Sequence, residues 1–270
     1  MENGSQPAVG DQSRRANSLN IVVLIKQVPD MNAVKIDRAT GTPVMSGQRV
    51  VSSYDEYAVE EALRLKEAHG GEVTVMSAGP PTAKDAVTRA LAMGADRGVL
   101  IDLPNANELD TLAVATVLAK ALGSIPYDLI LMGQTSDDYE TGHLGPQLAE
   151  LLKLPLVSSV MGLTIDGDRL TLRRDMEDGQ QTVETTLPAV LLAITGLNEP
   201  RYPSLKGIMA AKRKPLDQVT PVLDSTGPAR ISWGEPYVPE RTSGGTILQD
   251  VPAAEAAQQL VCWLQEHKLL

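Results

Sequence analysis

Four aliphatic runs alternate with helix-length amphipathic segments through the first half of the chain. The runs are IVVLI from Ile21, EVTVMSAG from Glu72, GVLID from Gly98 and LILMG from Leu129. Each is nearly continuous in apolar residues, which is typical of parallel strands buried on both faces. Strands and helices that alternate in this way predict an α/β fold with a doubly wound, mainly parallel sheet.

Polar residues and glycines mark the ends of the predicted helices. Ser53 and Glu56 have the spacing of a capping box before the first helix, and Thr82 and Asp85 repeat that spacing before the second. Gly70 predicts the C-terminal stop of the first helix. We therefore expect both helices to begin at these capping residues.

The pattern changes after the fourth predicted helix. Residues 156–195 alternate apolar and polar positions, with turn signals at Asp166-Gly167 and Asp178-Gly179. This predicts antiparallel strands added to the parallel sheet. Beyond Leu197 several prolines interrupt the chain, and a final amphipathic helix is expected from about Pro252.

Three parts follow from this organisation. We expect a disordered lead-in over residues 1–19, a nucleotide-binding α/β domain over 20–225 and a C-terminal arm over 226–270. A long tail with its own amphipathic helix usually lies on its own domain or on a partner. Both alternatives stay open at this point.

Composition excludes several functions. A formal net charge of -10 argues against nucleic-acid binding, because phosphate recognition needs a basic surface. The single cysteine, Cys262, cannot form an internal disulfide, and no Cys/His group has metal-ligand spacing, so no metal site is expected. No segment resembles a signal peptide or a membrane span. We expect a cytoplasmic protein without membrane insertion.

Candidate chemistry lies at the ends of three predicted strands. Ligands of doubly wound sheets bind beyond the carboxyl ends of the strands, where the chain reads KQVPD (26–30), SAGPPT (77–82) and QTSDDYETGHLGP (134–146). Gly79 allows close approach of a ligand, and the following helix start offers amides to a phosphate, although an ordinary turn would look the same. Neither a Walker loop nor a GxGxxG motif is present.

The third loop is ambiguous in itself. Thr141, Gly142 and Gly145 could cradle a phosphate. The acids Asp137, Asp138 and Glu140 would repel it unless they cap amides or hold hydroxyls. No Ser/His/Asp arrangement can be assembled from the three histidines. The residues alone therefore predict a nucleotide-binding domain and no catalytic side chain.

Five longer segments, in the same order along the chain, resemble the β subunit of electron transfer flavoproteins. They are IKQVPD from Ile25, EYAVEEALRLKE from Glu56, RALAMGADRGVLID from Arg89, EDGQQTVETTLPAVL from Glu177 and LNEPRYPSLKGIMAAKRK from Leu197. This resemblance implies an adenine-nucleotide α hydrolase-like fold and a heterodimer with an α subunit that carries FAD. The C-terminal arm would pack on that α subunit.

The resemblance leaves two nucleotides open. In the ordinary branch of the family an Asn-Gln-Thr-Gly stretch holds a structural AMP, and the subunit helps to shuttle electrons from dehydrogenases to a quinone-linked oxidoreductase. The aligned residues here are Gly142 to Gly145, which lack the Asn and Thr donors. In the electron-bifurcating branch the loop resembles DGDTAQVGP, which matches Asp138, Thr141 and 144–146, with His143 in the place of Gln.

The bifurcating branch is our main hypothesis. Its β-subunit FAD accepts a hydride from NADH and divides the electrons between the α-subunit FAD and a low-potential acceptor of the ferredoxin or flavodoxin class. The cofactor carries this chemistry, so no acid or base is required of the chain. The sequence of the loop also resembles the nitrogen-fixation-associated type of the family. That type works with a quinone-linked dehydrogenase and a ferredoxin-like subunit. Such a complex would bring the protein to the membrane. A remote alternative is a nucleotide-sensing protein without a redox role.

The loops and the resemblance together assign two sets of residues. The expected cofactor-binding residues are Lys26, Gln27, Val28, Pro29, Asp30, Tyr54, Asp55, Ser77, Ala78, Gly79, Pro80, Asp110, Thr111, Gly133, Asp138, Thr141, Gly142, His143, Leu144, Gly145 and Pro146. The expected partner-binding residues are Glu199, Arg201, Tyr202, Leu205, Ile208, Met209 and Arg241.

Overall fold

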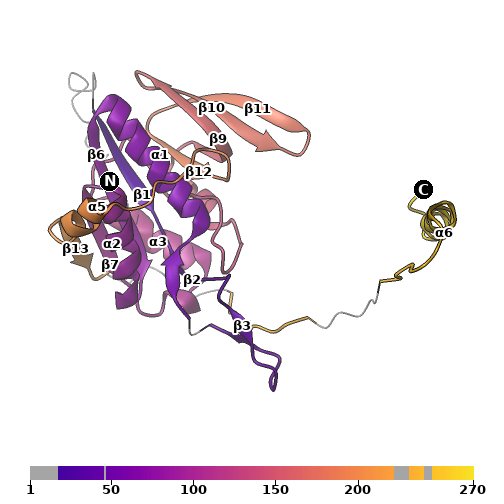
Figure 1. Ribbon diagram of the computed structural model, residues 1–270. Coiled ribbons are helices and arrows are strands. Elements are labelled where there is room, and N and C mark those ends of the chain that lie inside the picture. The colour runs from indigo at the N-terminus through magenta and orange to yellow at the C-terminus, as the bar shows by residue number, and fades with distance from the viewer. Residues whose placement is uncertain (1–17, 46, 222–230, 240–244) are drawn as a thin grey trace, which may run out of the picture. The chain divides into compact units, whose positions relative to one another are not determined.

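The chain divides into two units, and most of the elements labelled in Figure 1 belong to the unit with the large sheet. The computed structural model describes residues 18–45, 47–221, 231–239 and 245–270. Of these described residues, those from 18 to 36 and from 44 to 235 belong to one unit, and those from 37 to 43 and from 236 to 270 belong to the other. The first unit contains the nine-stranded sheet and is described first.

The sheet has the strand order β11-β10-β9-β12-β8-β1-β6-β7-β13. The strands from β9 to β13 in this order are all parallel, and β10 and β11 add an antiparallel edge. Their bounds are β1 Leu19–Leu24, β6 Gly71–Gly79, β7 Arg97–Asp102, β8 Leu129–Gly133, β9 Leu156–Asp166, β10 Arg169–Met176, β11 Gly179–Thr186, β12 Ala189–Ala193 and β13 Leu216–Val219. The predicted α/β class, with its mainly parallel sheet and added antiparallel strands, is confirmed.

One strand of the predicted antiparallel region runs the other way. β12 pairs in parallel with both β8 and β9, and its five residues are all buried. The expectation of an antiparallel strand here was wrong, because the chain leaves β9 for the hairpin strands β10 and β11 and then returns between β9 and β8. An alternating pattern indicates which face of a strand is buried and not its direction.

Helices cover both faces of the parallel strands. Ile21 and Val23 of β1 pack with residues of α1 (Ser53–His69) and α2 (Lys84–Met93). Val22 and Leu24 belong to a second cluster with α3 (Thr111–Leu122) and α4 (Leu144–Leu152). Successive side chains of a strand point to opposite faces, so β1 divides the core into two halves.

The strand order reverses beside β1. The chain passes from β1 to β6 and β7 and then returns to the other side of β1 to form β8. Such a reversal is a topological switch point, where the loops after neighbouring strands diverge and leave a crevice.

The predicted capping boxes are absent, and a remote carboxylate replaces one of them. Ser53 lies within α1, and its backbone N–H and hydroxyl donate to the Asp137 carboxylate at 2.8 and 2.6 Å. The 3-10 turn η2 (Pro81–Ala83) precedes α2, which has no side-chain cap. The C-terminal stop of α1 at Gly70 is confirmed, with φ of 72°.

The segment after β1 is less of a loop than expected. β2 (Gln27–Pro29) pairs antiparallel with β5 (Arg49–Val51). Between them lie the two-residue strands β3 (Lys35–Ile36) and β4 (Pro43–Val44). This pairing turns Val28 into the core, where it is fully buried.

The remaining helices are short or separate. The 3-10 turn η3 (Ala106–Glu108) precedes α3, and α5 (Leu205–Ala211) packs so closely on α2 that a Cβ on Gly207 would lie 2.3 Å from the carbonyl oxygen of Ala92. The second unit contains α6 (Ala253–Glu266), which confirms the helix expected from about Pro252. Within the part of the chain that the structure describes, no helix is long and apolar enough to cross a membrane.

Candidate functional site

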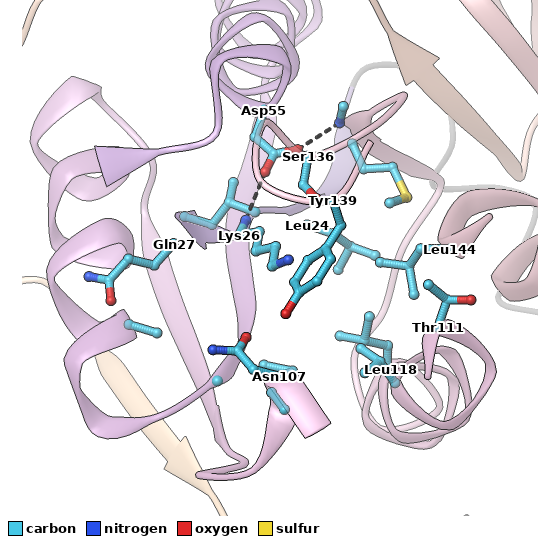
Figure 2. Close-up of a pocket in the computed structure, with 18 of the residues that line it drawn as sticks. Leu24, Lys26, Gln27, Asp55, Asn107, Thr111, Leu118, Ser136, Tyr139 and Leu144 are labelled. Atoms are coloured by element: carbon cyan, nitrogen blue, oxygen red, sulfur yellow. Dashed lines mark hydrogen bonds between the residues drawn. The ribbon is translucent and has the colours of Figure 1, made fainter. Parts of the chain in front are cut away.

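A cavity lies at the switch point, where the carboxyl ends of β1, β6 and β8 meet the amino end of α3 (Figure 2). It holds about 1110 Å³ of open space, counted together with its solvent-filled mouth. A cavity at this place in an α/β sheet, with an open mouth, is a usual site for a small-molecule ligand. All three loops that the sequence analysis singled out contribute to its wall.

About half of the predicted cofactor-binding residues line this cavity. They are Lys26, Gln27, Asp55, Ala78, Gly79, Pro80, Thr111, Gly133, Thr141, Gly142 and Leu144. They come from five separate segments, which only the parallel sheet brings together.

The other predicted residues lie outside the cavity wall: Val28, Pro29, Asp30, Tyr54, Ser77, Asp110, Asp138, His143, Gly145 and Pro146. Several have another role in the fold. Asp110 caps α3, because its carboxylate accepts the N–H of Ala113 at 2.8 Å. Gly145 leaves room for the core, since a Cβ there would lie 2.5 Å from Leu192 Cδ2.

The expected cofactor-binding residues leave out a further part of the wall, including four residues of the loop at 134–146 that the sequence analysis singled out. Polar members of this part are Arg49, Asn107, Gln134, Thr135 and Ser136, and aromatic members are Tyr139 and Trp233. Apolar members are Leu24, Ile25, Met76, Ala83, Ala106, Leu109, Val114, Leu118 and Met132. The apolar positions of α3 could have indicated some of these residues, but the sequence around Trp233 gives no sign that it lies beside a distant strand end.

Asp55 joins two strand ends at the floor of the cavity. Its Oδ2 accepts the backbone N–H of Lys26 at 2.7 Å, and its Oδ1 accepts that of Gly133 at 2.8 Å. Burial raises the pKa of Asp55 to about 7, although the two donated N–H bonds oppose that rise. Gly133 must be glycine here, because a Cβ would lie 2.6 Å from Asp55 Oδ1. The carboxylate therefore fixes the spacing of β1 and β8 where a ligand would rest.

The acidic residues of the third loop bind protein groups. Asp137 caps α1 through Ser53, and Asp138 accepts from Lys26 Nζ at 2.8 Å with only 9% of its side chain exposed. The same ammonium lies 4.4 Å from the ring centroid of Tyr139. The Asp138 charge is thus compensated by an ammonium group, and Asp137 accepts amide and hydroxyl hydrogen bonds, which reduces the repulsion of both carboxylates for a phosphate.

The cavity has polar atoms that suit a ligand. Among the described residues, Gln27 Oε1 and Thr135 Oγ1 are buried on this wall without a hydrogen-bond partner. Buried polar groups of this kind are normally satisfied by water or a ligand. Hydroxyl and amide groups among apolar walls fit the ribose or ribityl chain of a nucleotide. In the described parts of the chain, no three His, Cys, Asp or Glu side chains are grouped to hold a metal ion.

The predicted partner-binding residues form a separate exposed patch on and before α5. Tyr202 is 88% exposed and Leu205 84%, and Met209 and Ile208 follow on the helix. Glu199 is exposed, whereas Arg201 donates to Glu60 and Glu67 of α1. Arg241 lies outside the described residues.

The fold and the cavity define a class: an α/β protein with a candidate ligand site at the topological switch point of its sheet. Residues 41–223 match the model of the electron transfer flavoprotein domain. The chain belongs to the electron transfer flavoprotein β-subunit family.

Relatives support this membership along most of the chain. A protein of Thermoanaerobacterium thermosaccharolyticum named electron transfer flavoprotein subunit beta is 45% identical over 197 residues, 73% of this chain and 76% of the relative. The protein of the same name from Bacillus subtilis is 38% identical and covers 92% of this chain and 98% of its own length. Subunit CarD of the caffeyl-CoA reductase-Etf complex of Acetobacterium woodii is 34% identical over 93% of this chain and all of its own length.

Proposed function

We propose that this chain transfers electrons as the β subunit of a heterodimer with an electron transfer flavoprotein α subunit, and that its cavity binds FAD. The observation that carries the choice of FAD is the wide, mainly apolar cavity combined with the loop at 142–145. By the family resemblance, Gly142 and Leu144 stand where the ordinary, AMP-binding branch would have its Asn and Thr donors. An apolar wall suits the flat ring system of a flavin.

The residues present fit such a ligand. Thr141 and Gly142 would hold phosphate oxygens beside the amino end of α4, and the unpartnered oxygens of Gln27 and Thr135 would accept from hydroxyl groups. When bound, FAD would accept a hydride from NADH and pass the electrons on one at a time. The side chains position the cofactor and exclude water, and none has to exchange a proton.

The finer proposal is electron bifurcation. Electrons would pass by one route to the α-subunit FAD and by another to a low-potential acceptor of the ferredoxin or flavodoxin class. A quinone-linked dehydrogenase and a ferredoxin-like subunit are the proposed further partners, and they would place a cytoplasmic protein at the membrane. The Acetobacterium woodii relative is named as a subunit of a reductase-Etf complex, which supports the proposal that this chain also acts within a larger assembly.

The nucleotide content of the purified heterodimer tests this proposal. Co-expression with the α subunit, denaturation and chromatography of the released nucleotides should give two FAD and no AMP per heterodimer. One FAD with one AMP would contradict the FAD site and make the chain a structural subunit. NADH oxidation with a low-potential acceptor is then the test of bifurcation.

Filling the cavity should weaken flavin binding. Thr141 lies on the cavity wall, so Thr141→Trp should weaken FAD binding by about tenfold or more, since each 1.4 kcal/mol of lost contact is a factor of ten. Equilibrium dialysis of FAD against the heterodimer measures this. Gly145 is a poor probe, because a side chain there strikes Leu192 in the core.

Two matched variants control for the added bulk. Thr141→Ser keeps the hydroxyl and should keep FAD, and Thr164→Trp adds an indole at an exposed position of β9. Equal FAD affinity in Thr141→Trp and Thr164→Trp would show that the ligand lies elsewhere.

A further inference from the structure

Two of the few aromatic side chains of this chain meet at the mouth of the cavity. The chain has six tyrosines, two tryptophans and no phenylalanine. The rings of Tyr139 and Trp233 lie with their centroids 4.5 Å apart and their planes tilted by 37°. Both residues line the cavity, yet they are 37% and 39% exposed. Aromatic rings that serve only the core are normally buried more completely.

A chain of polar contacts holds this pair in place. Asp138 binds the Lys26 ammonium, which lies against the Tyr139 ring, and the indole N–H of Trp233 donates to the carbonyl oxygen of Leu109 at 3.5 Å. In Figure 2 the Tyr139 ring projects into the cavity with the Lys26 side chain beside it. Segments after β1, β8 and η3 thus fix the position of the two rings.

We propose that Tyr139 and Trp233 form an aromatic wall that stacks on a flat heterocyclic ring of the bound nucleotide, and that Asp138 and Lys26 are its positioning residues. The inference rests on the proposed nucleotide site. The proposal also explains the acidic residue Asp138, which would orient the aromatic wall through Lys26 instead of contacting a phosphate. Aromatic side chains stack on any flat heterocycle, so the wall suits either the adenine or the isoalloxazine ring.

Binding to Trp233 variants measures the contribution of the wall. AMP, FMN and FAD are each titrated by equilibrium dialysis against the nucleotide-depleted heterodimer. Trp233→Ala should weaken the ligand that stacks by about 10- to 100-fold, the usual effect of removing a stacking ring, whereas Trp233→Phe should retain most of the affinity. Weakening of AMP and FAD but not FMN assigns adenine to the wall; weakening of FMN and FAD but not AMP assigns isoalloxazine.

Trp263 provides the matched control. It is the other tryptophan and lies on α6, outside the cavity wall, so Trp263→Ala should leave all three affinities of the assembled heterodimer unchanged. Equal affinities in Trp233→Ala and Trp263→Ala would contradict the proposed stacking. The contact between Tyr139 and Trp233 would then be a packing contact only. Failure of the parent heterodimer to bind any of the three nucleotides would instead overturn the proposed function.

A spectroscopic readout separates stacking from folding. The chain is labelled with 5-fluorotryptophan and combined with unlabelled α subunit, and the two fluorine resonances are assigned with Trp263→Phe. Ligand should shift the Trp233 resonance and leave that of Trp263 in place, and Asp138→Asn or Lys26→Met should reduce the shift. A Trp233 resonance that does not move while dialysis shows bound ligand would overturn the proposal even if the alanine variant does not fold.

Discussion

Arg201→Ala should lower the free energy of unfolding by about 3 kcal/mol, because it leaves a buried carboxylate without its counter-charge. Arg201 Nε donates to Glu60 at 2.8 Å, and only 5% of the Glu60 side chain is exposed. A second nitrogen binds Glu67 at 2.5 Å. Arg201 is itself 35% exposed, which places the effect at the lower end of the range for broken buried pairs. Urea denaturation of the full chain measures it.

A conservative variant and a surface variant bracket this result. Arg201→Lys keeps one positive charge but loses the planar guanidinium group that reaches both carboxylates. Its free energy of unfolding should therefore lie between those of Arg201→Ala and the parent. Lys206→Ala, at an exposed position of α5, should change the unfolding free energy by less than about 0.5 kcal/mol. If Arg201→Ala lowered the free energy of unfolding no more than Lys206→Ala does, the ion pairs of Arg201 would not hold the segment before α5.

These contacts explain how an apolar patch is presented to solvent. Asn198 donates to the Tyr57 carbonyl and to Glu61, and Arg201 donates to Glu60, so the segment before α5 is fastened to α1. Hydrogen bonding to Arg201 also lowers the pKa of Glu67, which keeps that carboxylate ionised. Arg201 therefore acts within the chain as an anchor, and Tyr202 and Leu205 remain exposed.

The pattern of apolar and polar residues predicted most of the helices and strands, because each of them is formed by residues that are neighbours in the sequence. The continuous runs became β1, β6, β7 and β8, and their order placed three polar loops at one edge of the sheet. The rule that ligands bind at a switch point then located the cavity with no knowledge of any side-chain contact.

Contacts between distant segments were not predictable in the same way. A capping box can be recognised only within a few residues, and α1 is capped by Asp137 from the loop after β8. Trp233 reaches Leu109 and Tyr139 only after the chain has folded. The local pattern around Asp55 indicated a helix start, and its contact with two strand ends depends on the register of β1 and β8.

The contribution of Asp55 to stability should decline as the pH rises from about 4 to about 7. The unfolded acid loses its proton near pH 4, whereas burial raises the folded pKa to about 7, so in this window the folded state binds more protons. The free energy of unfolding therefore falls with rising pH, by up to about 4 kcal/mol at 1.36 kcal/mol per pKa unit. Above pH 7 both states are ionised, and the contribution stays constant.

Asp55→Asn isolates this contribution, because a carboxamide does not titrate. The difference in unfolding free energy between the parent and Asp55→Asn should favour the parent most near pH 4 and shrink by pH 7. Asp178→Asn, in the exposed turn between β10 and β11, is the matched surface control and should change the free energy of unfolding by less than about 0.5 kcal/mol. A constant difference for Asp55→Asn would mean that the N–H bonds from Lys26 and Gly133 keep the carboxylate ionised in spite of burial. The floor of the cavity would then carry a fixed negative charge throughout this pH range.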